Sequence, residues 1–325
     1  MISIDALQNL IFQSRELSHA GIHSFDFEDG KKTFYCGSNA LEAFIEKNNI
    51  MKIYSTVPID YRAVKEGIIL SIGSTREHNM ARLDSFKSGI QYATCPLPFS
   101  NDSFVTDRWG GSIDKPASIM NFPTAVILDW KICLNEGLEK NLPGVGEASG
   151  LVTSIYDYLK VHKIENITLY WEEAKTYVNR LLYLWQSNGC DESRIIDLGA
   201  VLSFKGLLMR RCADNSIGAS CDHMISYFLQ ASGFQLPHGV LVFIGMLISL
   251  MAIDEELCDF YLRIGRNIGL IHESDIILLL KLDFHNLFQE SARLRPLRKT
   301  FIRDISTEES YKIGERFKRR IRSYV

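Results

Sequence analysis

Three side chains of this 325-residue chain have the types and the settings that suit a single divalent metal ion. Glu147 lies in the string GVGEASG, His223 in SCDHMIS and His238 in LPHGV. One carboxylate and two imidazoles form a common catalytic ligand set, because they leave coordination positions open for a substrate oxygen. The three residues therefore predict a metal centre, with zinc as the expected ion and iron and nickel as alternatives.

Each of these residues also has an ordinary structural interpretation. Glu147 is expected to begin a helix, where a negative charge is favourable even without a metal. His238 follows a proline and precedes a glycine, so it could simply mark the start of a helix. His223 could be a satisfied core residue, and it shares a helical face with Tyr227, four positions later. Its neighbour Asp222 could orient a metal-bound imidazole or serve as an acid at a helix start.

The residues before these segments are predicted to form a sheet with crossover helices. Short β-rich apolar runs alternate there with helical patterns, which is typical of α/β domains. The run at residues 67–72 is nearly all apolar, as expected of a buried parallel strand. Predicted strands cover residues 32–36, 51–57, 67–72, 91–95 and 124–128, and a predicted helix covers residues 39–48.

After Gly146 the pattern changes to long segments with helical spacing. Two compact domains are also the expected number for a chain of this length. We therefore expect an α/β domain over residues 1–142 and an all-helical, metal-binding domain over residues 143–325. The predicted helices cover residues 151–161, 172–187, 195–209, 221–230, 239–253, 254–268 and 273–282.

The metal-binding segments resemble those of the superfamily that holds sn-glycerol-1-phosphate dehydrogenase, glycerol dehydrogenase, iron-containing alcohol dehydrogenases and 3-dehydroquinate synthase. In the glycerol-1-phosphate dehydrogenase branch, Gly-x-Gly-Asp is similar to the GVGE that ends at Glu147, and Ser-Gly-x-Glu-His is similar to the ASCDH that ends at His223. A following His-Gly matches His238, and the strings PLPFSNDS and SFKGLLM resemble two more motifs of that branch. The resemblance covers roughly residues 65 to 255. It implies a Rossmann-like α/β N-terminal domain and an all-α C-terminal domain, as in dehydroquinate synthase.

The resemblance also implies an NAD or NADP site, at a turn that departs from the family pattern. The family has three glycines after a strand and then Asp, Ala and Lys, whereas the string GSTREHNMAR keeps one glycine, with Asn for Asp and Arg82 for Lys. Glycines let the backbone approach a pyrophosphate, and the helix start offers N–H donors. Arg76 or Arg82 could pair with phosphate, but the turn's hydroxyls and Arg82 would compensate only in part, so we expect NAD(P)H to bind more weakly than is usual, or not at all. The residues implied to bind the cofactor are Gly73, Ser74, Thr75, Asn79 and Ser100.

The loop after the strand at residues 91–95 supplies the candidate catalytic residue. The resemblance implies that Asp102 faces the substrate, as a polar partner to a substrate hydroxyl. The alternative is a turn carboxylate that caps the residues after it. A phosphorylated substrate would also need a basic group, for which Arg210, Arg211 and Lys160 are candidates.

The function implied by the resemblance is that of a metal-dependent, NAD(P)-linked oxidoreductase. Its substrate would be a small polyol phosphate or the corresponding ketone, as for sn-glycerol-1-phosphate dehydrogenase. Two alternatives stay open. One is a 3-dehydroquinate synthase-like sugar-phosphate cyclase, a lyase, although the Glu-x-x-Lys motif of that branch is missing after Glu147. The other is a non-enzymatic or cofactor-deficient descendant, which fits the altered turn and the short first domain.

Composition and charge exclude several other classes of protein. With 46% hydrophobic residues and a net charge of −3, the chain has no general attraction for nucleic acid or anionic membranes. Its seven cysteines are scattered, which argues against a disulfide framework or a thiolate zinc site. The longest apolar run, residues 239–253, is short for a membrane span, and the N-terminus does not read as a signal peptide. We expect a cytoplasmic protein without a membrane span, for which a homo-oligomer stays open. The arginine-rich C-terminal segment reads as a solvated helix face.

Overall fold

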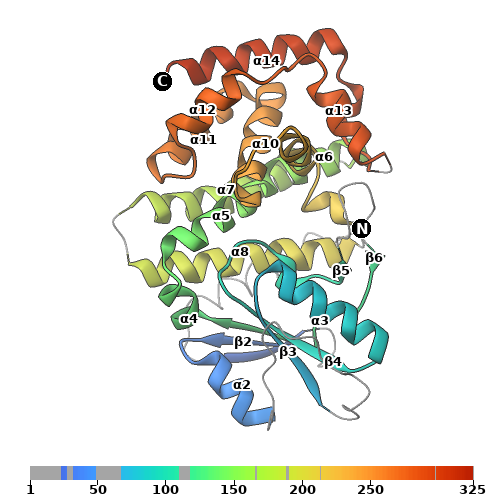
Figure 1. Ribbon diagram of the computed structural model, residues 1–325, viewed down its shortest axis with the longest axis vertical. Coiled ribbons are helices and arrows are strands. Elements are labelled where there is room, and N and C mark those ends of the chain that lie inside the picture. The colour runs from blue at the N-terminus through green and yellow to red at the C-terminus, as the bar shows by residue number, and fades with distance from the viewer. Residues whose placement is uncertain are drawn as a thin grey trace. The chain divides into compact units, whose positions relative to one another are not determined.

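The computed structural model describes residues 23–27, 32–48, 67–109, 118–164, 167–187, 190–212, 214–296 and 298–324. The chain divides into two compact units. The first combines residues 1–144 with 189–212, and the second combines residues 145–188 with 213–325. The predicted fold class is confirmed, because the described strands all precede residue 130 and the described elements after them are helical (Figure 1). The predicted strand at residues 51–57 lies outside the described residues.

The first unit is built on a five-stranded sheet in the order β1-β2-β7-β4-β3. Strands β2, β7, β4 and β3 are parallel, and β1 runs antiparallel to β2 at one edge. The loops that follow the parallel strands therefore gather at one edge of the sheet, where open α/β folds bind ligands. The bounds are β1 His23–Phe27, β2 Lys32–Gly37, β3 Ile68–Gly73, β4 Gln91–Pro96 and β7 Ala125–Asp129, with α2 Ala40–Asn48 after β2 and α3 Thr75–Ser88 after β3.

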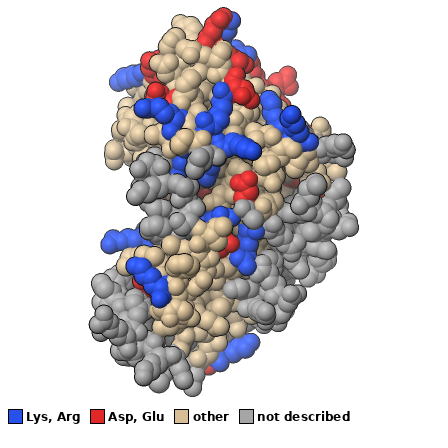
Figure 2. Space-filling view, turned by 90° about the vertical axis from the view of Figure 1, so that its right-hand side faces the viewer, with Lys and Arg blue, Asp and Glu red and all other residues tan. Residues whose placement is uncertain are grey.

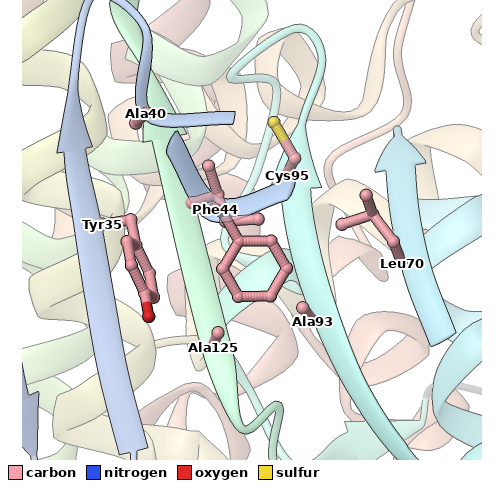
Figure 3. Close-up of a cluster of buried hydrophobic side chains, with 8 residues drawn as sticks. Tyr35, Ala40, Phe44, Leu70, Ala93, Cys95 and Ala125 are labelled. Carbon is pink, nitrogen blue, oxygen red and sulfur yellow. The ribbon is translucent and has the colours of Figure 1, made fainter. Parts of the chain in front are cut away.

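Successive strand residues point to opposite faces of the sheet, and each face has its own helix. On one face, Phe44 of α2 lies over Ala93 and Ala125, and Leu70 of β3 belongs to the same buried apolar cluster (Figure 3). On the other face, Ala81 of α3 packs against Ile69. Apolar residues on both faces explain the nearly continuous apolar runs of these strands.

Helix α8 also belongs to the sheet-containing unit. The chain thus returns to this unit after leaving it, and the predicted ranges 1–142 and 143–325 do not include that return. Gly206 allows α8 to approach the 3-10 helix η2 closely, because a Cβ there would lie 2.5 Å from the backbone oxygen of Val105. The remaining elements of this unit are η2 Ser103–Val105, β5 Arg108–Trp109, β6 Ser118–Ile119, α4 Trp130–Asn135 and α8 Asp191–Cys212.

The second unit is helical throughout its described residues and is organised around α10. Nearly every side chain of α10 is buried, so the prediction of a buried helix at residues 239–253 is confirmed. No helix in the described part of the chain is long and apolar enough to cross a membrane. The helices are α5 Leu138–Ser149, which begins in the first unit, α6 Leu151–Val161, α7 Ile167–Gln186, α9 Cys221–Ala231, α10 His238–Ile253, α11 Glu255–Asn267, α12 Glu273–Leu280, α13 Leu287–Leu294 and α14 Thr307–Arg322, with the 3-10 helices η3 Asn215–Ile217 and η4 Phe301–Asp304.

The charged surface agrees with the nearly balanced composition. Basic and acidic side chains are interspersed on the face shown in Figure 2. The arginine-rich α14 presents a solvated face, as expected, because Arg316 and Arg320 are exposed while they pair with Glu255 and Asp259 of α11. All seven cysteines are free thiols, as their scattered positions predicted.

Candidate functional site

Glu147 comes from the last turn of α5, and the prediction that it begins a helix is wrong. The helix starts at Leu138 and continues through Pro143. A proline removes one backbone donor and can kink a helix without ending it. A carboxylate near a helix C-terminus is disfavoured by the helix dipole. Because Glu147 is also only 2% exposed, its charge needs a positive partner.

His223 supplies the first imidazole, from the first turn of α9. Its Nε2 lies 3.1 Å from Oε1 of Glu147, and its Nδ1 lies 2.7 Å from Oδ2 of Asp222. Asp222 is fully buried, and its Oδ1 accepts hydrogen bonds from the Ser154 hydroxyl and the Ser220 backbone N–H. With Asp222 ionised, Nδ1 carries the proton, and Nε2 faces the Glu147 oxygen with a lone pair. The Nε2 lone pair and the Glu147 oxygen are both acceptors, so their close approach is stable only when a second proton or a cation lies between them.

His238 supplies the second imidazole, at the first position of α10. Its Nε2 lies 3.6 Å from Oε2 of Glu147, so the two histidines approach different oxygens of one carboxylate. The ring of Tyr227 is stacked on His238 with centroids 5.9 Å apart, which limits the rotation of the imidazole. The side chain of His238 is 40% exposed, against 2% for Glu147, so solvent and small molecules reach the site from this side.

Glycines bring the three helices close enough for these contacts. A Cβ on Gly146 would lie 2.2 Å from the backbone oxygen of Gly239, so α5 and α10 touch backbone to backbone beside Glu147 and His238. A Cβ on Gly245 would lie 2.2 Å from the backbone oxygen of Asp222, so α10 and α9 meet in the same way. Gly146, next to Glu147, and Gly245 of α10 therefore have packing roles that the motifs alone did not reveal.

The donor set and its spacing fit a divalent metal. The three ligand atoms lie within 4.8 Å of one another. Atoms that share one zinc ion at about 2.0–2.2 Å lie roughly 3–4 Å apart, close to the spacing found here. The buried carboxylates of Glu147 and Asp222 flank His223, an arrangement that suits a cation at this point. The convergence of the three residues was predicted, and their role as ligands remains a proposal.

A second buried carboxylate, Asp157 of α6, holds the loop that precedes α9. It accepts hydrogen bonds from the hydroxyls of Ser220 and Thr300 and from the backbone N–H of Phe301. Burial raises the pKa of Asp157, and these hydrogen bonds oppose that effect. Asp157 thereby links the start of α9, which carries His223, to the segment before η4.

Asp222→Asn is expected to weaken metal binding about 10- to 100-fold, because the neutral amide makes the partner imidazole a poorer ligand. Titration of the metal-free protein with zinc in competition with a chromogenic chelator would measure the change. Asp254→Asn is a matched control, since Asp254 also lies at a helix start in this unit and caps α11. An unchanged zinc affinity in Asp222→Asn would show that Asp222 does not support a metal ligand.

The turn predicted to bind a dinucleotide lies between β3 and α3 in the first unit. Side chains of the protein itself engage its polar groups. The backbone N–H and the hydroxyl of Ser74 both donate to Oε2 of Glu77, at 2.9 and 2.8 Å. Asn101 donates to the hydroxyl oxygens of Thr75 and Ser100, and Asn79 accepts from Arg82 at 2.6 Å. In this conformation the turn does not fit a pyrophosphate.

Two of the basic residues near this turn, Arg82 and His78, are buried, whereas Arg76 is exposed. Arg82 is fully buried and donates to Tyr92, Asn79 and two backbone oxygens, so its proposed pairing with phosphate is wrong. His78 is also buried, and its Nδ1 lies 2.9 Å from the Ser71 hydroxyl. Burial and the charge of Arg82 lower the pKa of His78 to about 3, so the imidazole is neutral near pH 7.

Asp102 precedes η2 in the first unit, where it lies beside a buried lysine that the sequence did not single out. Nζ of Lys205, from α8, is 3.7 Å from Oδ2 of Asp102, and the lysine side chain is fully buried. A buried ammonium beside a carboxylate is an uncommon arrangement that functional sites often use. The signal in the sequence was one lysine inside the apolar string SFKGLLM. Of the other basic candidates, Arg210 pairs with Asp107 at 3.1 Å and Lys160 lies over the ring of Tyr156.

No protein-family model and no curated protein sequence matches the chain. Solved structures do match it. A probable glycerol dehydrogenase from Sinorhizobium meliloti has a TM-score of 0.62 and 16% identity, over 79% of this chain and 78% of that one. The glycerol dehydrogenase from Schizosaccharomyces pombe has a TM-score of 0.59 and 14% identity, over 80% and 71%. An iron-containing alcohol dehydrogenase from Thermotoga maritima has a TM-score of 0.53 and 14% identity, over 86% of each chain.

These likenesses show that the chain has the two-domain fold of glycerol dehydrogenases and iron-containing alcohol dehydrogenases. The fold that the short motifs implied is thus confirmed. The glycerol-1-phosphate dehydrogenase branch is not distinguished by these structures. Since one fold serves many activities, the function has to be argued from the site.

Proposed function

We propose that this chain is a metal-dependent oxidoreductase that interconverts an alcohol and a ketone. The observation that carries the proposal is the approach of two imidazole Nε2 atoms to the two oxygens of the buried Glu147, at 3.1 and 3.6 Å. The fold supports it, because the similar structures include glycerol dehydrogenases and an iron-containing alcohol dehydrogenase.

Each residue of the site has a distinct part in this proposal. Glu147, His223 and His238 would hold the cation, which supplies a Lewis acid for the oxygen of an alcohol or ketone. Asp222 accepts the Nδ1 proton of His223 and so keeps the Nε2 lone pair directed at the ligand position. The exposed edge of His238 leaves an open side for a small substrate. Zinc remains the expected metal, with iron and nickel as the alternatives.

The proposed substrate is a small polyol, and its phosphorylated form is the finer proposal. An arginine beside the site supports an anionic group, since the guanidinium of Arg295 lies 4.8 Å from the ring centre of Tyr227, the residue stacked on His238. Asp102 remains our candidate for the polar partner of a substrate hydroxyl, now with Lys205 beside it.

NAD or NADP remains the proposed redox partner. We expect it to bind weakly, because the Glu77 carboxylate already accepts a hydrogen bond from the backbone N–H of Ser74 in the turn.

A test combines metal analysis with assays on one preparation of the full chain. We expect about one zinc or iron ion per chain. We also expect metal-dependent turnover of NAD(P)H with dihydroxyacetone phosphate, or of NAD(P) with glycerol 1-phosphate, and slower turnover with unphosphorylated glycerol. Removing the metal by chelation and restoring it should abolish and restore the rate. A protein that retains no divalent metal after purification and reconstitution would contradict the proposal.

A second candidate is a metal-binding descendant that no longer uses a dinucleotide. The contact between Glu77 and Ser74 favours this candidate. The Glu77 carboxylate already accepts the hydrogen bonds of the Ser74 N–H and hydroxyl at the start of α3. This candidate predicts retained metal without NAD(P)H turnover in the same assays. The cyclase alternative has no comparable support, since Ala148, Ser149 and Gly150 follow Glu147 without the lysine of that branch.

A further inference from the structure

Glu77 lies across the turn where a dinucleotide would place its pyrophosphate. The turn follows β3, at the sheet edge where the parallel strands end, and leads into the 14-residue helix α3. The first N–H groups of such a helix have no partner within the helix, so they attract an anion. Here the anion comes from the third residue of the helix itself, because Oε2 of Glu77 accepts from the backbone N–H and the hydroxyl of Ser74.

The same carboxylate also fills the space beside the one remaining glycine. Gly73 has φ +143°, and a Cβ built on it would lie 2.8 Å from Cγ and 2.9 Å from Oε2 of Glu77. In a dinucleotide site the glycine leaves this space open for phosphate oxygens. Glu77 therefore takes both the donors and the volume that a pyrophosphate needs.

Several other polar groups at the turn are also engaged by the protein itself. Thr75 and Ser100 receive hydrogen bonds from Asn101, and Asn79 accepts from Arg82. Partial burial acts to raise the pKa of Glu77, and the hydrogen bonds from Ser74 outweigh it, so the pKa lies below its ordinary value. The group is therefore anionic near pH 7, and it repels a second anion.

We infer that Glu77 acts as an internal substitute for phosphate at the start of α3, and that this turn holds a dinucleotide only when the Glu77 carboxylate leaves it. The Glu77 residue is partly exposed. The identity of one residue, rather than the loss of two glycines, then sets the affinity for the nucleotide. The inference involves no residue of the metal-binding unit.

Titration of the full chain with NADH, ADP and inorganic pyrophosphate tests the inference. Glu77→Ala empties the turn, and Glu77→Gln keeps its shape but removes the charge. We expect Glu77→Ala to bind NADH and ADP roughly tenfold or more tightly than the wild type, with a smaller gain for Glu77→Gln. Glu42→Gln is the matched control, since it removes one exposed charge from the first turn of α2 and is expected to change nothing.

The possible results separate clearly. Submicromolar binding of NADH to the wild type would overturn the inference, as would equal affinities in the wild type and both Glu77 variants. An equal gain in Glu42→Gln would also overturn it, by pointing to bulk charge. Thermal melting would verify that each variant is folded. Metal content is measured on the same samples and bears on the proposed function alone, so a failure of one proposal is not mistaken for a failure of the other.

Discussion

Replacing His223 with alanine is expected to reduce the metal content of the purified protein to background. The substitution removes a buried ligand and leaves the carboxylates of Glu147 and Asp222 facing an empty space. His238 and Glu147 alone form a two-ligand site, and zinc sites in proteins have three or four protein ligands. Plasma mass spectrometry after dialysis against a weak chelator would measure the loss.

The same variant should also lose the stabilisation that metal provides. A ligand present at 1,000 times its Kd stabilises the folded state by about 4 kcal/mol. Chelation should therefore lower the Tm of the wild type and leave the Tm of His223→Ala unchanged. His285→Ala is a suitable control, because His285 is an exposed histidine of the same unit. Stoichiometric metal in His223→Ala would refute the proposed ligand set.

Arg82→Lys is expected to destabilise the sheet-containing unit by about 3 kcal/mol. The guanidinium is fully buried and donates to the Tyr92 hydroxyl, to Asn79, and to the backbone oxygens of Arg108 and Ser103. A lysine is a point charge without the planar fork, so it satisfies only part of this set. Each buried acceptor left without a donor costs about 1–3 kcal/mol.

Urea unfolding, with hydrogen exchange of the amides in β3 and β4, would measure this effect. Arg76→Lys is the matched control, since Arg76 lies on the exposed side of the same helix. We expect a lower urea midpoint for Arg82→Lys and an unchanged midpoint for Arg76→Lys. If both variants unfold like the wild type, Arg82 does not anchor α3 to the loops around η2, and its assignment as a structural residue is wrong.

Much of the fold could be predicted because it depends on local patterns. Apolar runs of strand length marked β2, β3, β4 and β7, and helical spacing marked most of the second unit, with α6 matching its predicted bounds of 151–161. Errors arose where long-range packing outweighed local preference. Glu147 was expected to begin a helix, yet α5 begins at Leu138 and places Glu147 in its last turn. The two-residue strands β5 and β6 carry too few residues to show a period.

The residues discussed for the candidate sites also fall into two groups, those that the sequence could identify and those that only the structure could. Glu147, His223 and His238 could be chosen from sequence because metal ligands must be of a few residue types, and short motifs preserve them. The contacts of Glu77 and Arg82 could not be chosen in that way. Each is an ordinary polar residue on α3, and only the coordinates show that one caps a turn and the other fills a buried pocket of acceptors.

The sequence by itself determined the type of chemistry available, because residue identity sets which atoms can bind a cation. It also indicated four strands of the sheet and most helices of the second unit, because hydrophobic period follows backbone geometry. The tertiary structure alone decided which residues meet. Glu147 and His223 are separated by 76 positions, and their 3.1 Å contact exists because three helices pack without side chains at Gly146 and Gly245. Close packing of that kind depends on atoms distant in the chain, which no local pattern records.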